Sequence, residues 1–65
     1  MKNYSSREII KIVNADGWIL ARVEGSHHIF KHDNKKGIVT IPHPKKNIPL
    51  KTAKNIFAQA GLSMD

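Results

Sequence analysis

Cysteine and long apolar runs are both missing from this chain of 65 residues. Without thiols the chain can form neither a disulfide framework nor a thiolate metal site, and it needs no oxidising compartment. The apolar runs are only a few residues long, whereas a membrane-spanning helix needs about 20 apolar residues in sequence. Met1 and Lys2 also lead into no apolar core of the kind found in signal peptides. We therefore expect a cytoplasmic protein with no membrane segment.

Acidic residues are scarce. Five Asp and Glu stand against eleven Lys and Arg, which gives a net charge of +6 and a pI of about 10.0. Asp33 is the only acid between residues 31 and 54, and the bases of this segment are Lys31, Lys35, Lys36, Lys45, Lys46, Lys51 and Lys54. Such an excess attracts phosphate backbones by Coulomb attraction and by release of condensed counterions. A nucleic acid is therefore the first expected partner; the alternatives are an anionic membrane, an acidic protein or a merely solvated surface.

The short chain also restricts the architecture. Residues 1–65 are expected to form one domain, and a chain of this size buries only about 60% of its unfolded surface, which disfavours a deep, enclosed active site. Ser5 and Glu8 fit a capping box that begins a helix over roughly 6–16. A second amphipathic helix is predicted over about 50–60, where Gly61 ends it.

Three apolar, β-branched segments separate the two predicted helices. They cover residues 18–23, 27–32 and 38–41, with turn residues between them, and read as antiparallel strands joined in a meander. The prolines at 42 and 44 make the following segment a loop. The predicted order is α-β-β-β-α, an α+β fold with two helices on one face of a three-stranded sheet. This arrangement matches the double-stranded RNA-binding domain, whose members bind A-form duplexes by shape, phosphate and 2′-hydroxyl contacts.

Two adjacent histidines, His27 and His28, begin the second predicted strand directly after a turn. Imidazoles titrate near neutrality, so they can take or give a proton at physiological pH. Strand alternation places His28 with Phe30 and His27 with Lys31 on opposite faces. If Phe30 packs under the helices, His28 leans inward and His27 is exposed with Lys31. Trp18 is predicted to belong to the core; the alternative is a platform on which a base stacks. The alternative to catalysis is a pair of surface or half-buried histidines with no chemical role.

Two further features of the histidines bear on ligands. Four histidines could suggest a zinc site formed by His27, His28, His32 and His43. However, adjacent residues of a strand point to opposite faces, and the sequence has no carboxylate or thiolate cluster to complete the coordination. We therefore expect neither a metal nor a cofactor. Prolines on both sides of His43 restrict the backbone of its loop. Lys45 and Lys46 can therefore bind a ligand with little loss of conformational entropy. This loop is predicted to contact RNA; the alternative is a stiff loop whose lysines only maintain solubility.

Four segments in the same order resemble the HicA toxins, the RNases of HicA–HicB toxin–antitoxin systems. They are Asp16-Gly17-Trp18, Gly25-Ser26-His27 with Phe30, Val39-Thr40-Ile41-Pro42-His43-Pro44, and Gln59-Ala60-Gly61-Leu62. The likeness covers nearly the whole chain and implies a double-stranded-RNA-binding-like fold. It also implies metal-independent endoribonuclease activity on mRNA, as the toxin of a type II pair inhibited by a HicB-like antitoxin. The family's essential histidine follows a Gly-Ser or Gly-Gly pair, which implies that His27 is the catalytic residue. In some members this histidine comes one residue later, which would correspond to His28.

The predicted site follows from the resemblance and the charges together. His27 is expected to act as general acid or base, with His28 as runner-up, and Lys31 and Lys45 to bind phosphate. The second proton-transfer partner is His28, His43 or water. The expected RNA contacts are Lys31, Lys45, Lys46, His43 and Ser26. Two other functions compete: a non-catalytic module that grips duplex RNA with the same face, and a small interaction domain for acidic proteins.

Overall fold

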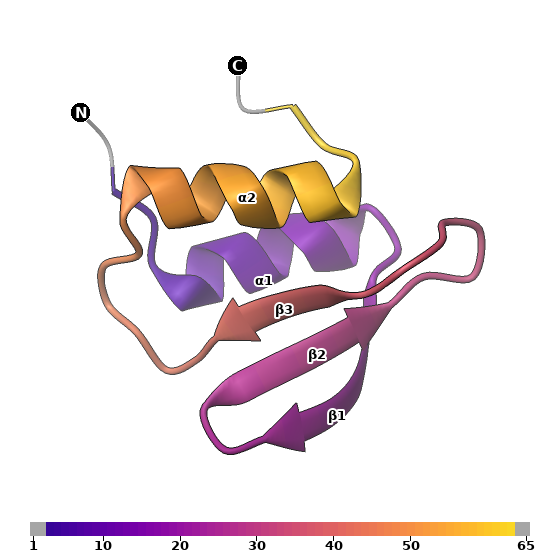
Figure 1. Cartoon of the computed structure of the whole chain (residues 1–65), viewed down its shortest axis with the longest axis horizontal. Coiled ribbons are helices and arrows are strands. Elements are labelled where there is room, and N and C mark those ends of the chain that lie inside the picture. Colours follow the sequence, from indigo (N-terminus) through magenta and orange to yellow (C-terminus); the bar gives the residue numbers. More distant parts are fainter. Residues whose placement is uncertain (1–2, 64–65) are drawn as a thin grey trace.

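The computed structural model describes residues 3–63 and has the predicted order of elements. They are α1 (Ser6–Ala15), β1 (Ile19–Glu24), β2 (His27–Lys31), β3 (Val39–Pro42) and α2 (Leu50–Ala60). The strands form an antiparallel sheet in the order β1-β2-β3, and both helices lie on one face of it (Figure 1). The predicted α+β fold, similar to a double-stranded RNA-binding domain, is confirmed.

The helix ends form as the sequence predicts. Ser5 caps α1 through a full capping box, in which Glu8 N–H donates to Ser5 Oγ at 3.1 Å and Ser5 N–H donates to Glu8 Oε1 at 3.0 Å. At the end of α2, Gly61 is left-handed with φ of 71°, and Leu62 N–H donates to the carbonyl of Phe57 at 2.8 Å. This bond is the signature of a Schellman motif. The start of α1 and the end of α2 are therefore fixed by local hydrogen bonds.

The three strands differ by one residue at their ends from the predicted ranges 18–23, 27–32 and 38–41. Pro42 is predicted to lie in the loop after the third strand, but it is the last residue of β3 and lies opposite His27. The sheet tolerates proline here because β3 is an edge strand. The N–H groups on its outer side have no neighbouring strand to bond, so the missing N–H of a proline costs no hydrogen bond of the sheet.

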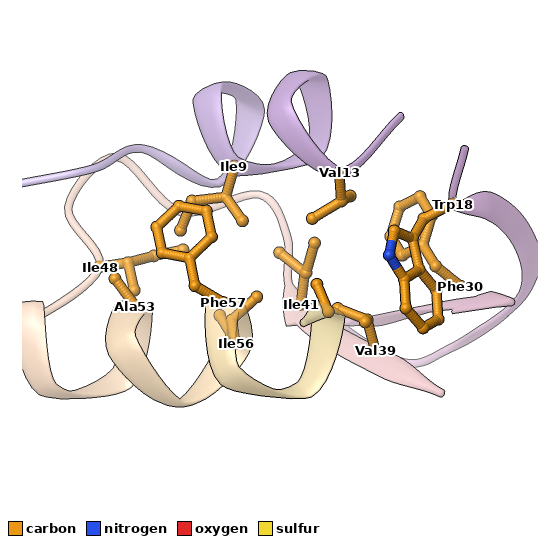
Figure 2. Close-up of a cluster of buried hydrophobic side chains, with 11 residues drawn as sticks. Ile9, Val13, Trp18, Phe30, Val39, Ile41, Ile48, Ala53, Ile56 and Phe57 are labelled. Carbon is orange, nitrogen blue, oxygen red and sulfur yellow. The ribbon is translucent and has the colours of Figure 1, made fainter. Parts of the chain in front are cut away.

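The core lies between the helices and the sheet. Trp18 and Phe30 are almost completely buried, at 1% and 2% exposure, which confirms the prediction that both belong to the core. Figure 2 shows their rings packed at one end of a layer of aliphatic side chains from α1, β3 and α2. The buried cluster consists of Ile9, Val13, Trp18, Phe30, Val39, Ile41, Ile48, Ala53, Ile56, Phe57 and Ala60.

The outer strand β1 is much less covered than the rest of the sheet. Both helices contact β3, whereas all six residues of β1 are exposed, including the apolar Ile19, Leu20 and Val23. In Figure 1 this strand lies at the edge farthest from α2. Its pairing with β2 shifts between Leu20 and Arg22, which is the irregularity of a bulge. The overhang of β1 leaves space beside α1, and that space becomes part of the candidate site.

A cluster around Asp16 fastens the turn after α1 to the end of α2. Lys35 Nζ donates to Asp16 Oδ2 at 2.6 Å and to the carbonyl of Ala60 at 3.0 Å. The bond from Lys35 holds the pKa of Asp16 below its ordinary value. His32 Nδ1 accepts a bond from Asn34 N–H, so Nε2 carries the proton and donates to the carbonyl of Asp16 at 2.7 Å. His32 is thus occupied by structural bonds.

Gly17 should not tolerate a side chain. Its φ is +106°, and a Cβ built on it would lie 2.7 Å from His32 Nε2. We expect Gly17→Ala to lower the free energy of unfolding by about 1–3 kcal/mol, because it combines backbone strain with displacement of His32. Gly37→Ala is the matched control, since Gly37 also has positive φ but no atom within 4 Å of the added Cβ. If urea denaturation gave the same loss of unfolding free energy for both variants, the contact with His32 would add nothing to the destabilisation by Gly17→Ala.

Candidate functional site

The two adjacent histidines lie on opposite faces of the sheet, as strand alternation predicts. His28 is half-buried and shares the helix-covered face with Phe30. His27 is exposed on the open face, where its neighbours across the sheet are Glu24 on β1 and Pro42 on β3. Each imidazole therefore has a different environment, and the two cannot serve one ligand from the same side.

A second imidazole meets His28 from the loop after β3. The backbone N–H of His43 donates to the carbonyl of Ser26 at 2.8 Å, which ties this loop to the start of β2. The rings of His28 and His43 then pack edge to face, with centroids 4.8 Å apart and an interplanar angle of 83°. His28 Nδ1 is buried without a hydrogen-bond partner in the described part of the chain. Nε2 is consequently the nitrogen of His28 that remains available to a ligand.

Ser6 holds the loop of His43 against the first turn of α1. Its hydroxyl lies 2.6 Å from His43 Nδ1 and accepts the backbone N–H of Lys45 at 2.9 Å. The backbone N–H of Ser6 returns a bond to the Lys45 carbonyl at 2.9 Å. Ser6 is only 1% exposed, so these bonds are shielded from competing water. The position of His43 is therefore set from both β2 and α1.

An open groove of about 520 Å³ runs between α1 and the overhanging β1, and we call it the apolar groove. Ile10, Ile19 and Leu20 are among its apolar wall residues, and His28 and His43 lie on its lining as well. Apolar walls with a few polar groups are typical of small-molecule and nucleobase sites. The two imidazoles are therefore accessible to a ligand that occupies this groove.

A second open groove, of about 600 Å³, lies at the N-terminal end of α1, and we call it the basic groove. Its cationic side chains are Arg7, Lys45 and Lys46, and His43 lines it too. His43 is thus shared by both grooves, so a polyanion held by the cations would pass the imidazole pair. None of the three cations has an ion pair among those identified in residues 3–63.

The predicted site residues gather only in part. Lys45, Lys46 and His43 line the basic groove, and His43 contacts both the ring of His28 and the carbonyl of Ser26. Lys31 is not among them, because it lies at the other end of β2 on the open face, and the three residues from His28 to Lys31 span about 10 Å of strand. It shares that face with His27.

Sequence reasoning missed two participants, Ser6 and Arg7. Both fall inside the capping-box segment, where a helix start already explained them. The histidines also form no metal cluster within residues 3–63: His27 faces away from His28, and His32 bonds Asp16 and Asn34. In the same described range no helix is long and apolar enough to cross a bilayer.

The comparisons with known proteins agree with this fold. No curated protein matches the sequence. One chain of a solved structure, described as a toxin–antitoxin complex from Streptococcus pneumoniae, is 30% identical and superposes with a TM-score of 0.74 over 89% of this chain and 97% of that chain. A family model for the HicA toxin of bacterial toxin–antitoxin systems matches residues 6–62, which include both helices, the sheet and the loop of His43. The chain therefore belongs to the HicA toxin family.

Proposed function

We propose that this toxin is an endoribonuclease that cleaves mRNA by acid–base catalysis without a metal ion. The observation that carries the proposal is the contact between His28 and His43 at the meeting of an apolar and a basic groove. Family membership supports it, because the HicA resemblance implies RNA cleavage. The positive net charge of +6 supports an RNA substrate independently.

The proposed reaction requires two proton transfers. One group removes the proton of a ribose 2′-hydroxyl, whose oxygen then attacks the adjacent phosphorus. As the new O2′–P bond forms, the P–O5′ bond breaks, and a second group protonates the leaving 5′-oxygen. Neighbouring cations stabilise the negative charge that gathers on the phosphate oxygens in the transition state. Two imidazoles can supply both transfers, one as the base and one as the acid.

Among the two adjacent histidines, the contacts favour His28. The sequence ranks His27 first, and that assignment stays a prediction. His28, however, contacts a second imidazole and lines a groove, whereas His27 lies on the open face between Glu24 and Pro42. We therefore assign the proton transfers to His28 and His43 as a pair.

Lys45 and Lys46 are proposed to bind RNA phosphates along the basic groove, together with Arg7. We expect the double variant Lys45→Gln/Lys46→Gln to bind RNA more weakly. The slope of log affinity against log salt should also become less steep by about 1.4–1.8, because each lost phosphate contact contributes about 0.7–0.9. Filter binding or anisotropy at several salt concentrations measures this.

The matched control for that double variant is Lys51→Gln/Lys54→Gln, which removes the same charge from the exposed face of α2. An equal change in slope for the two double variants would mean that net charge alone drives binding. A single Lys31→Gln variant measured beside them tests the predicted phosphate contact on the open face.

A HicB-like antitoxin is proposed to inhibit this toxin. The supporting observations are the toxin–antitoxin complex among similar structures and the openness of both grooves on a small domain. A partner that docks over His28 and His43 would exclude RNA without any change in the toxin fold. Expression of the chain without an antitoxin should then arrest growth, whereas a passive binding module would be tolerated.

The decisive experiment incubates the purified protein with a defined transcript in EDTA. We expect cleavage products with 5′-hydroxyl ends and cyclic or open 3′-phosphates, as the displacement by O2′ requires. RNA binding without cleavage would favour the alternative, a non-catalytic duplex-RNA module. Loss of cleavage in EDTA that zinc restores would overturn the metal-independent mechanism, and absence of RNA affinity at low salt would favour a domain for acidic proteins.

A further inference from the structure

We propose that Ser6 is a positioning residue, whose hydroxyl keeps the proton of neutral His43 on Nδ1 and thereby makes Nε2 the nitrogen that exchanges protons with RNA. The inference deepens the proposed function and rests on it for its catalytic meaning. Its structural content, the tautomer of His43, can be measured in the free protein. Neither the sequence pattern nor the family match assigns this role to Ser6.

The argument begins with the bonding capacity of a hydroxyl. Ser6 Oγ has one proton and two lone pairs. It has three close polar neighbours: the backbone N–H of Lys45 at 2.9 Å, His43 Nδ1 at 2.6 Å and the carbonyl oxygen of Lys45 at 3.1 Å. The N–H of Lys45 occupies one lone pair. The single hydroxyl proton must then go either to the carbonyl or to Nδ1.

Only one of these arrangements gives Ser6 Oγ a hydrogen bond to all three neighbours. If His43 carries its proton on Nδ1, that N–H donates to Ser6 Oγ, and the hydroxyl proton donates to the carbonyl of Lys45. If the hydroxyl donates to Nδ1 instead, two oxygens face each other at 3.1 Å with no proton between them. The Lys45 carbonyl still accepts the backbone N–H of Ser6 at 2.9 Å, so the cost of this arrangement is the repulsion between the lone pairs of two oxygens. Ser6 is 1% exposed, and the surrounding bonds hold the two oxygens close together. The geometry therefore favours the Nδ1–H form.

This tautomer suits a residue that both takes and gives a proton. In neutral His43 the lone pair is on Nε2, on the opposite side of the ring from Ser6, so Nε2 can act as a base. When Nε2 takes a proton, the Nδ1–H bond to Ser6 remains unchanged and the cation is still satisfied. Groups that fix the second nitrogen of a working histidine in this way are a general device of histidine chemistry.

The alternative that Ser6 only fixes the loop makes a different prediction about the tautomer. A purely structural serine needs only some bond to His43, and either tautomer would serve. Long-range ¹H–¹⁵N correlation spectra of the imidazole nitrogens distinguish the Nδ1–H form from the Nε2–H form at a pH where His43 is neutral. We expect Nδ1–H in the wild-type protein, and a predominant Nε2–H form there would overturn the proposal.

Two variants complete the test. Ser6→Ala removes the hydroxyl, and we expect it to shift His43 towards the Nε2–H form and to lower kcat for RNA cleavage by roughly 10- to 100-fold. Thr52→Ala is the matched control, since it removes an exposed hydroxyl from α2, away from both grooves and from the bonds to His43. It should leave the His43 tautomer and kcat unchanged. A Ser6→Ala protein with the wild-type tautomer would contradict the role of the hydroxyl.

The failures of the two proposals remain distinguishable. If wild-type protein does not cleave RNA although His43 is in the Nδ1–H form, the proposed function fails and the assignment of the tautomer stands. If RNA is cleaved but His43 is in the Nε2–H form, the role of Ser6 fails alone. Should Ser6→Ala not fold, the spectrum of the wild-type protein still decides the tautomer.

Discussion

Replacement of His28 by alanine should reduce RNA cleavage by roughly 10²- to 10⁴-fold, the usual contribution of a positioned acid or base. The expectation follows from the contact of its ring with His43, at 4.8 Å between centroids, and from its place on the lining of the apolar groove. The initial rate of cleavage of a defined transcript in EDTA measures the effect. Affinity for RNA should change far less, because the cations of the basic groove remain.

His27→Ala provides the matched comparison for this variant. The two histidines are adjacent in sequence, but His27 is exposed on the open face beside Glu24 and Pro42. We expect this variant to retain most of the wild-type cleavage rate. An inactive His27→Ala protein beside an active His28→Ala protein would return the catalytic role to His27, in agreement with the ranking from sequence. Circular dichroism of both variants distinguishes a loss of activity from a loss of folding.

The largest effect on stability is expected for Phe30→Ala. Phe30 is 2% exposed in a core that also contains Trp18, and removal of a buried phenylalanine side chain typically costs about 3–5 kcal/mol. A domain of 65 residues has a total stability of about 3–10 kcal/mol at 0.05–0.15 kcal/mol per residue. The variant should therefore lose from about a third to all of its free energy of unfolding. Urea titration followed by circular dichroism gives the free energy of unfolding.

Ile19→Ala is the control for that core substitution. Ile19 lies on the overhanging strand β1 and is 60% exposed, so its truncation should change the free energy of unfolding by no more than about 0.5 kcal/mol. A loss of several kcal/mol at Ile19 would mean that β1 is covered in solution. That result would contradict the open apolar groove on which the proposed function depends.

Local chemistry made most of the architecture predictable. The capping box of Ser5 and Glu8 determines where α1 begins, and the left-handed Gly61 determines where α2 ends, because each acts within a few residues. Period-two alternation likewise determined that His28 faces inward with Phe30 and that His27 faces out. The prediction of Trp18 in the core was also correct. Even so, alternation could not decide which face of the sheet carries the chemistry.

The sequence by itself determined the order of elements, the excess of positive charge and the orientation of each histidine on its strand, because these follow from neighbours along the chain. Only the tertiary structure decided that His43 meets His28, that Ser6 bonds His43, and that Lys31 lies apart from Lys45. Those contacts join residues far apart in sequence, and they depend on the path of the loop after β3 over the end of α1. No periodic pattern encodes that path, since it results from packing of the whole core and from bonds between segments that meet only after folding.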